Sequence, residues 1–395
     1  MRKIKLARGI LTIQLLVLFS YSSIAMLTLL SLFFEHLGGS PRQIGFLMGL
    51  FSLAAFLSRP FGGWLLSKYN PRKVMIAGLI LLLVVTALYL LIRELNWFVM
   101  LIRIFHGLGF SVFILAALLI TIVLVREEER AYAIGIVSTG FMLPLLIVPF
   151  VGEEIIHTFG YFLFFLSAVF LAAIPLIYSF FAKIDIPRLS DDSQAKSMGF
   201  FRLLRQKKVY VIYLLTLVFE IGLSSSLAFV PLLAHGGSSM RAGYFYTLLA
   251  LVAVFMRVVG GSQLRSWGSA KLLPPAFCFI AGGGVLTSLS SNNFLLGLSG
   301  IVWGVGVGIL YPHLSAIAVK GIPSGEKGKV LSLFASSVDL GFALGPIAFG
   351  WMYQSLGIRP AFIIVSVSIF ICSAFLILWG RSSLFVRGRD SQAEE

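Results

Sequence analysis

Charged residues are scarce in this chain. They make up 12% of its 395 residues, against about a quarter in a typical soluble domain. Hydrophobic residues make up 58%, and the mean hydropathy is +0.98. This composition excludes a soluble enzyme, a disordered protein and a secreted disulfide scaffold, and it indicates an α-helical membrane protein.

Cysteine is almost absent, and sequence signs of enzyme chemistry are missing. Cys278 and Cys372 both fall in apolar stretches, where we expect small buried hydrophobic residues rather than a disulfide or a metal-binding pair. The sequence has no His/Cys cluster, no nucleophile motif and no Gly-x-x-x-x-Gly-Lys-Ser/Thr loop for ATP. A membrane enzyme or receptor is therefore disfavoured, and we expect no catalytic residue, metal or cofactor.

Apolar runs separated by charged or Gly/Pro/Asn breaks predict twelve transmembrane helices, since each run approaches the 20 or so residues that cross a bilayer. The first run, 10–34, ends at Glu35 without a small-x-small cleavage site, so we expect a retained helix rather than a signal peptide. The other spans are expected at 43–67, 73–92, 97–125, 131–156, 160–182, 209–234, 242–264, 271–290, 294–320, 330–354 and 360–380.

Basic residues outnumber acidic ones by 31 to 16, and their positions predict the topology. If the N-terminus is inside, nearly all the Lys and Arg outside the spans lie in inside segments. The outside loops then hold only Arg42, Arg93, Arg241 and Arg359. This asymmetry predicts that both termini are in the cytoplasm. It also explains the net charge of +15, so the charge is no sign of nucleic-acid binding.

The longest polar stretch, 183–208, divides the chain into two six-helix bundles. We expect an N-terminal bundle at 1–182, a cytoplasmic linker at 183–208 with an amphipathic helix, a C-terminal bundle at 209–382 and a cytoplasmic tail at 383–395. The bundles repeat, because a shift of 198 residues carries Arg59-x-x-Gly62-Gly63 onto Arg257-x-x-Gly260-Gly261. Such a repeat predicts a binding site near the membrane midplane, between the halves.

Two motifs resemble signatures of the major facilitator superfamily. The segment Gly63–Lys73 is similar to its cytoplasmic signature Gly-x-Leu-x-Asp-Arg-x-Gly-Arg-Arg/Lys, with Ser67 and Asn70 replacing the Asp and the second Gly. Arg103-x-x-His106-Gly107-x-Gly109 is similar to the Arg-x-x-Gln-Gly-x-Gly signature of proton-coupled members.

A third motif resembles the Gly-Pro signature of antiporters in that superfamily. Gly140-x-x-x-Pro144 matches it in part, and its repeat partner Asp339-x-Gly341-x-x-x-Gly345-Pro346 matches it more fully. The resemblance covers essentially the whole chain and is nearest to bacterial proton-coupled efflux members. It implies a secondary transporter that works by alternating access.

The same motifs supply candidate gating residues. Gly62 and Gly63 allow close helix approach, and Pro144, Gly345 and Pro346 are expected to bend their helices. We expect Gly345 and Pro346 to face the other half near Gly62 and Gly63. The resemblance implies a cytoplasmic latch against the span 330–354, formed by Ser67, Lys68, Arg72 and Lys73. The alternative is that these basic residues only set the topology.

Ionisable residues inside spans are costly and are therefore candidate coupling sites. Glu220 lies 11 residues into its span, about 16 Å deep, which is near the membrane centre. An ionised carboxylate is costly there and a neutral one is not, so its protonation should follow access to water. Asp339 and His106 are further proton-coupling candidates. The alternatives are structural pairing for the acids and a satisfied core position for His106.

The candidate substrate residues lie near these groups. Tyr213, Thr216 and Ser224 share a helical face with Glu220. Arg103 is expected either to contact substrate, to pair with Glu153 or Glu154, or to bond backbone carbonyls. The remaining candidates are the aromatic residues Tyr21, Trp303 and Tyr311.

Together these features predict proton-coupled efflux of an amphipathic small molecule. Amides, which sugar sites need, are few within the spans. The alternative is uptake or exchange of an organic anion recognised by intramembrane arginines: Arg103, with Arg59 or Arg257 as further candidates. We expect a monomer in a bacterial inner membrane, with the lipid bilayer, the substrate and protons as its partners.

Overall fold

The computed structural model describes residues 2–126, 129–182, 205–236, 240–258, 269–322 and 324–380. Within these ranges all regular secondary structure is helical. The greater part of the expected linker, the expected tail, and Gly260 and Gly261 lie outside the described residues.

The first half of the chain contains long helices joined by short turns. Its first span runs without interruption through a 3₁₀ turn, a second 3₁₀ turn follows α4, and a third lies between α6 and α7. The elements are α1 (Arg2–Met26), η1 (Leu27–Leu29), α2 (Leu30–His36), α3 (Pro41–Lys68), α4 (Pro71–Leu88), η2 (Tyr89–Leu91), α5 (Trp97–Leu124), α6 (Arg130–Met142), η4 (Leu143–Leu146) and α7 (Val148–Phe181).

The second half contains six α-helices and one 3₁₀ turn among its described residues. They are α9 (Lys207–His235), α10 (Ala242–Val258), η6 (Ser269–Leu272), α12 (Leu273–Leu289), α13 (Asn293–Val319), α14 (Ser324–Leu356) and α15 (Ile358–Trp379).

Local signals in the sequence explain where several helices begin. Ser40 and Gln43 form a capping box at the start of α3, with Pro41 in the first turn. Asn70, Asn96 and Asn292 cap α4, α5 and α13, each accepting a backbone N–H with its side-chain oxygen.

Nine stretches among the described residues are long and apolar enough to cross a membrane, and α10 and α12 are shorter apolar helices. The 28-residue α3 is about 42 Å long at 1.5 Å per residue, which exceeds the ~30 Å hydrocarbon core. The longest stretch, Ala133–Phe181, joins two expected spans. The backbone breaks inside it at Gly160, whose φ of 78° favours glycine.

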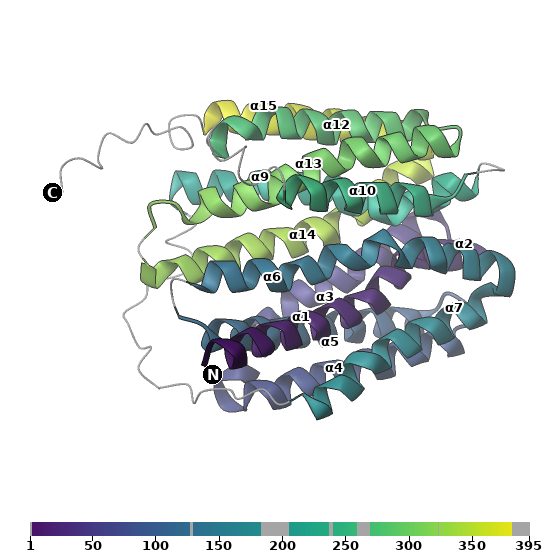
Figure 1. The fold of residues 1–395 in the computed structure, drawn as a ribbon. Coiled ribbons are helices and arrows are strands. Elements are labelled where there is room, and N and C mark those ends of the chain that lie inside the picture. The colour runs from purple at the N-terminus through teal and green to yellow at the C-terminus, as the bar shows by residue number, and fades with distance from the viewer. Residues whose placement is uncertain are drawn as a thin grey trace.

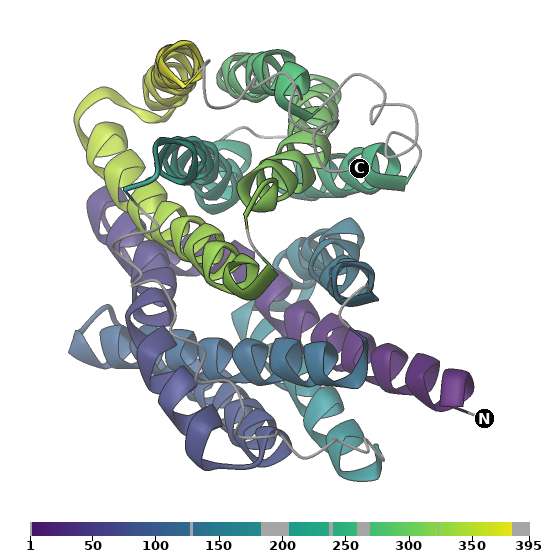
Figure 2. The same cartoon turned by 90° about the vertical axis from the view of Figure 1, so that its left-hand side faces the viewer.

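The helices of the two halves lie side by side (Figures 1 and 2). One group comprises α1, α3, α4, α5 and α7, and the other comprises α9, α10, α12, α13 and α15, while α14 runs alongside α3. The start of α1 and the end of α15 lie at one end of the molecule (Figure 1). We call this the proximal end, and the opposite end the distal end.

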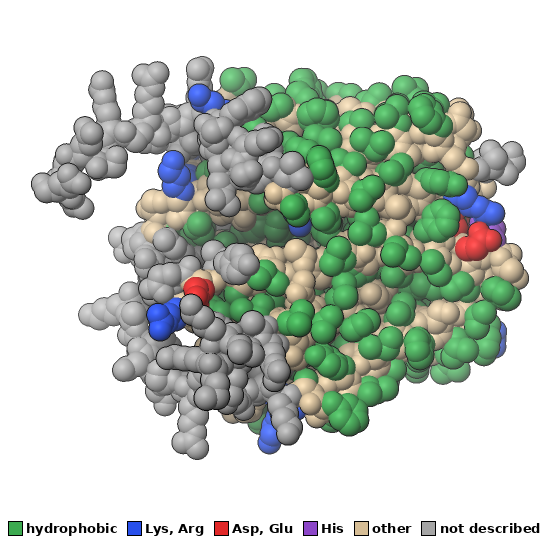
Figure 3. All heavy atoms as spheres, viewed as in Figure 1, with side chains coloured by type: hydrophobic (Ala, Val, Ile, Leu, Met, Phe, Trp, Pro, Cys, Tyr) green, Lys and Arg blue, Asp and Glu red, His purple; other side chains and the backbone are tan. Residues whose placement is uncertain are grey.

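Apolar side chains cover most of the face shown in Figure 3, and the described charged side chains on it gather mainly toward the two ends. Cys278 and Cys372 are free and exposed, so the expectation that they are buried is wrong. An apolar stretch in a membrane helix can face lipid as well as a protein core, and hydrophobicity alone does not distinguish the two.

Candidate functional site

An ion pair joins the two halves of the chain. Arg59 on α3 donates through Nε to Oδ2 of Asp339 on α14, at 2.5 Å. Arg59 also donates through Nη2 to the carbonyl oxygen of Ala335, at 3.4 Å. The two side chains are 23% and 15% exposed. Asp339 therefore lies where α3 of the first half meets α14 of the second.

Glu220 and Arg257 lie close to that ion pair, but no described residue bonds them. Glu220 on α9 is 2% exposed, and its Oε2 atom is buried without a hydrogen-bond partner. The Nε and Nη2 atoms of Arg257 on α10 are buried and unpartnered in the same way. Glu220 is within electrostatic range of both Arg257 and Asp339. Since buried polar atoms are nearly always bonded, this pair of exceptions marks a candidate binding site.

Two tyrosines complete this group. The guanidinium carbon of Arg257 lies 5.5 Å from the ring centroid of Tyr311 on α13. Tyr21 on α1 packs edge-on against Phe141 and is within electrostatic range of Glu220 and Tyr311. We call the six residues the central cluster: Tyr21, Arg59, Glu220, Arg257, Tyr311 and Asp339. Both halves contribute to it.

The rest of the polar face expected on α9 serves helix packing. The hydroxyl of Thr216 donates to the carbonyl of Ile212. The hydroxyl of Ser224 is within bonding distance of the Gly341 carbonyl on α14. Tyr213 is half-buried. These bonds lie within α9 and between α9 and α14. The hydroxyls of Thr216 and Ser224 therefore already have hydrogen-bond partners, unlike the carboxylate of Glu220.

Arg103 is a structural residue in the first group of helices. It is 4% exposed, and it donates through Nε to the Leu47 carbonyl at 2.8 Å and through Nη2 to the Met48 carbonyl at 2.9 Å. The expected pairing with Glu153 or Glu154 is wrong, because α3 supplies the acceptors instead. With its donors used in this way, Arg103 fits the backbone-bonding alternative rather than contact with substrate.

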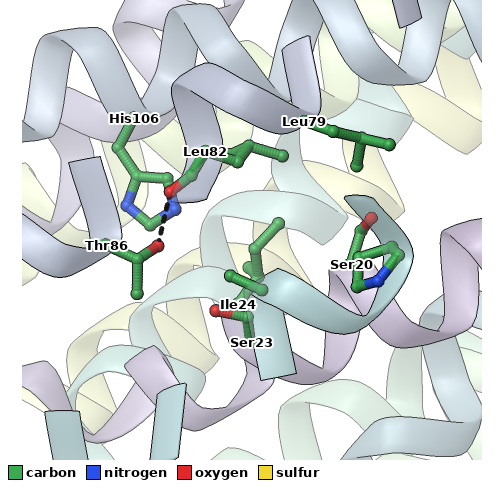
Figure 4. A pocket seen from close by; sticks show the side chains of 9 residues that line it. Ser20, Ser23, Ile24, Leu79, Leu82, Thr86 and His106 are labelled. Atoms are coloured by element: carbon green, nitrogen blue, oxygen red, sulfur yellow. Dashed lines mark hydrogen bonds between the residues drawn. The ribbon is translucent and has the colours of Figure 1, made fainter. Parts of the chain in front are cut away.

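His106 lies one turn from Arg103 and outside the central cluster. Its Nδ1 is 3.3 Å from the hydroxyl of Tyr89, and its Nε2 has no bonding partner among the described residues. The His106 side chain borders a small cavity inside the first group of helices, with Ser20, Ser23 and Thr86 around it (Figure 4). The cavity has room for about one water molecule. The structure thus brings together Glu220 and Asp339, but not His106.

Trp303 is a packing residue. It is 1% exposed, and its indole ring lies against the backbone of Gly283 on α12, where an added Cβ would come within 2.8 Å of it. Its indole Nε1 is buried without a hydrogen-bond partner among the described residues, and its expected place in a substrate site stays a prediction.

Several contacts hold the halves together at the distal end. The buried carboxylate of Glu153 on α7 accepts the backbone N–H groups of Ala242 and Gly243 at the start of α10, at 3.0 and 2.8 Å. The hydroxyl of Thr247 donates to the Leu146 carbonyl at 2.7 Å. We call these three hydrogen bonds the distal latch.

The distal end is also closed by the contact between α3 and α14. A Cβ on Gly45 would lie 2.2 Å from the Pro346 carbonyl oxygen and 3.0 Å from Cα of Gly350. The guanidinium carbon of Arg42 lies 3.2 Å from the ring centroid of Trp351. Toward the proximal end, by contrast, the molecule is hollowed between the two groups of helices (Figure 3).

The gating glycines and prolines are placed differently from the expectation. Gly345 faces Ser224 and Ile221 of α9, in its own half, rather than the first half. Pro346 does approach α3, but at Gly45. Gly62 packs against Leu115 of α5, and Gly63 is exposed. Close approach across the halves therefore occurs near the distal end of α3, far from the Gly62-Gly63 pair.

Pro144 is the second residue of the 3₁₀ turn η4, which interrupts the α-helical path between α6 and α7. It is buried, and the next residues of the turn include Leu146, an acceptor in the distal latch. The structure therefore has a 3₁₀ turn at Pro144, and the expected bend in gating stays a prediction.

The signature segment bonds within its own half. Arg72 donates through Nη2 to the carbonyls of Ser179 and Ala182 on and after α7, at 3.1 and 2.8 Å. Ser67 donates to the Trp64 carbonyl, and Lys68 lies over the Trp64 ring. Lys73 is exposed. The recorded bonds of this segment do not include the expected latch to α14.

Sequence reasoning missed the Arg59–Asp339 pair and the position of Arg257 beside Tyr311. One signal was available, since the 198-residue shift equates Arg59 with Arg257. Equivalent positions in two repeats face the same interface, so both arginines could have been placed at the centre.

Comparison with known proteins identifies the family and the fold. The family model of the Major Facilitator Superfamily matches residues 10–335 and 275–395. The chain is 25% identical to a staphylopine export protein of Staphylococcus aureus over 381 residues, covering 90% of this chain and 94% of the relative. It is 26% identical to the multi-drug resistance efflux pump PmrA of Streptococcus pneumoniae over 374 residues, covering 90% and 92%.

Solved structures show the same fold. A bacterial homologue of the human lysosomal transporter Spinster, in an inward-facing conformation, has a TM-score of 0.75 at 16% identity and covers 96% of this chain and 97% of that one. These relatives are carriers rather than enzymes. The chain is a multi-pass membrane transporter and belongs to the Major Facilitator Superfamily.

Proposed function

We propose that this protein exports an amphipathic small molecule from the cytoplasm in exchange for protons, by alternating access. The observation that carries the proposal is the central cluster, which places unpartnered buried polar atoms between the two halves. A site at that interface is exposed to one side of the membrane or the other as the halves rock. Efflux is supported by the relatives named as exporters.

Glu220 is the proposed proton carrier. It is almost fully buried, and its Oε2 has no bonding partner among the described residues. Charge on such a carboxylate is costly unless water or a cation reaches it. A proton and a substrate therefore compete to satisfy the same group. Each of them can shift the balance between two conformations.

Asp339 has a different proposed role. Its ion pair with Arg59 spans the two halves, so relative motion of α3 and α14 changes the separation of the two charges. A buried pair that loses one partner leaves the other charge unsatisfied. Protonation of Asp339 would release Arg59, which links the proton to the movement.

We also propose twelve transmembrane helices in two six-helix repeats, with both termini cytoplasmic. The nine long apolar stretches include one broken at Gly160, which counts as two, and α10 and α12 supply two more. The basic residues of the expected inside segments give the orientation. A monomer in a bacterial inner membrane fits the bacterial exporters among the relatives.

Exchange or uptake of an organic anion is the second candidate. It is favoured by the two unpartnered donor atoms of Arg257, which a carboxylate would accept. In this candidate function Arg257 is the arginine that recognises the anion, whereas the sequence pointed first to Arg103.

The test uses purified protein in lipid vesicles with an acidic lumen and the amphipathic dye rhodamine B outside. Proton-coupled exchange predicts dye accumulation above the level in protein-free vesicles, abolished by dissipating the gradient. Glu220→Gln should still exchange dye for dye at saturating concentration but should no longer accumulate it. Glu94→Gln, an exposed matched change, should behave as the parent. Accumulation by Glu220→Gln at the parental rate would contradict the proposal.

A further inference from the structure

The unusual feature of the central cluster is that it leaves one acid and one base unsatisfied at the same time. Among the residues that the structure describes, Glu220 Oε2 lacks a donor, and Arg257 Nε and Nη2 lack acceptors. The two groups are within electrostatic range of each other, yet their charged atoms are not within the 4.0 Å of an ion pair. Each is therefore available to another molecule.

The neighbouring charges do not supply the missing partners. Asp339 is the other acid near Glu220, and its Oδ2 is bonded to Arg59. The four charged groups of the cluster balance, with two acids and two bases. The Arg59–Asp339 pair satisfies itself, and Glu220 and Arg257 remain as a separated pair of opposite charges.

The charge balance restricts the ligands that suit such a site. An anion at Arg257 would leave Glu220 without a donor, and a cation at Glu220 would leave Arg257 without an acceptor. An unsatisfied buried charge is costly in either case. A molecule with one cationic and one anionic group satisfies both side chains and keeps the net charge of the site unchanged.

Aromatic rings lie beside the same charged groups. The ring of Tyr311 lies beside the Arg257 guanidinium and packs against Phe334 at a centroid distance of 5.3 Å. Tyr21 approaches from the first half of the chain and packs against Phe141. These rings suit a flat or apolar body between the two charged groups of a ligand.

We infer that the central cluster binds a zwitterion, with its cationic group at Glu220 and its anionic carboxylate-like group at Arg257. This deepens the proposed function and rests on the central cluster being the transport site. The two candidate functions allow a ligand with a single positive or a single negative charge. A zwitterion site would favour a ligand that carries both charges.

The experiment compares three xanthene dyes that share a ring system and differ in charge. Rhodamine B is a zwitterion at neutral pH, its ethyl ester is a cation, and fluorescein is an anion. Binding to the purified full-length protein is followed by fluorescence anisotropy. We expect rhodamine B to bind roughly tenfold to a hundredfold more tightly than either other dye. Its ester lacks the carboxylate that accepts a charge-assisted hydrogen bond from Arg257, and fluorescein lacks the cationic group that makes an ionic contact with Glu220.

Variants assign each charge to its side chain. Arg257→Gln should lower the affinity for rhodamine B to that of its ester and leave the ester's affinity unchanged. Glu220→Gln should lower it to that of fluorescein. Arg257→Lys, which keeps the charge, should lie between. Arg93→Gln and Glu94→Gln change exposed residues and should bind as the parent does.

The outcomes separate this inference from the proposed function. Equal affinity for rhodamine B and its ester, or for rhodamine B and fluorescein, overturns the zwitterion site even if proton-driven accumulation occurs. Tight binding of rhodamine B that depends on both side chains supports the zwitterion site. If the same protein then fails to accumulate dye on a proton gradient, the proposed coupling falls and the binding site stands.

Discussion

Glu153 allows a quantitative test of how the distal end is held closed. Its buried carboxylate accepts two backbone N–H groups from α10, at 3.0 and 2.8 Å, across the interface between the halves. Hydrogen bonds to a charged group contribute about 1.5–3 kcal/mol each. Removing both in Glu153→Ala should therefore destabilise the closed distal end by about 3 kcal/mol or more. That corresponds to a population shift of at least on the order of 100-fold.

The shift can be measured as a distance between spin labels. Arg93 and Ser291 are exposed and lie in loops after η2 and before α13, one in each half. Labelled cysteines there, in a background with Cys278 and Cys372 replaced by serine, report the separation of the halves by double electron–electron resonance. A closed state favoured 100-fold in the parent should become about equally populated with a wider one in Glu153→Ala.

Glu154 supplies the matched control for this measurement. It is the next residue and exposed, and its recorded hydrogen bond is to Thr158 within the same helix, at 3.4 Å. Glu154→Ala should leave the distance distribution unchanged. If Glu153→Ala and Glu154→Ala give the same distribution as the parent, the carboxylate does not hold the distal end closed, and the energetic reasoning is refuted.

Three further changes test other parts of the structure. Gly45→Val should push α3 away from α14, because its first added atom would lie 2.2 Å from a carbonyl oxygen; the same spin-label distance should widen, and an unchanged distance would contradict tight packing there. Asp339→Asn should lower the thermal unfolding temperature, since it leaves Arg59 without its charged partner at a cost of about 3 kcal/mol; Arg59→Gln in the same chain should restore part of the loss, and no restoration would mean that the pair is not coupled. An impermeant maleimide added to intact cells should label a cysteine at Arg93 and not one at Arg205, and the reverse pattern would invert the proposed topology.

The fold was predictable because membrane helices carry their signal in composition. Apolar runs long enough to cross a bilayer are detectable in any window, and the stretches seen in the structure fall on the expected runs. The exact ends were less predictable. A turn was expected between two spans, but in the structure α7 runs from one span into the next. Gly160, whose φ is 78°, kinks the helix at that point.

The site was predictable only in part. Ionised side chains are energetically costly at membrane depth, which pointed to Glu220 and Asp339 as candidates. Both lie in the central cluster. The partners of Arg103 could not be read from the sequence, because backbone carbonyls are present at every residue and carry no signal of their own. Trp303 shows the same limit, since a large aromatic residue suits a binding site and a helix interface equally well.

The crossing of α3 and α14 has a consequence for how often the protein can cycle. At Gly45 and Gly350 the contact is between two backbones, with no side chain on either surface. Separating them frees no rotamers, and rejoining them freezes none, so the entropy cost of re-forming the contact is small. The alignment of the two helices is set by their own main chains. If the halves rock as proposed, this contact between two backbones parts and re-forms in the same register.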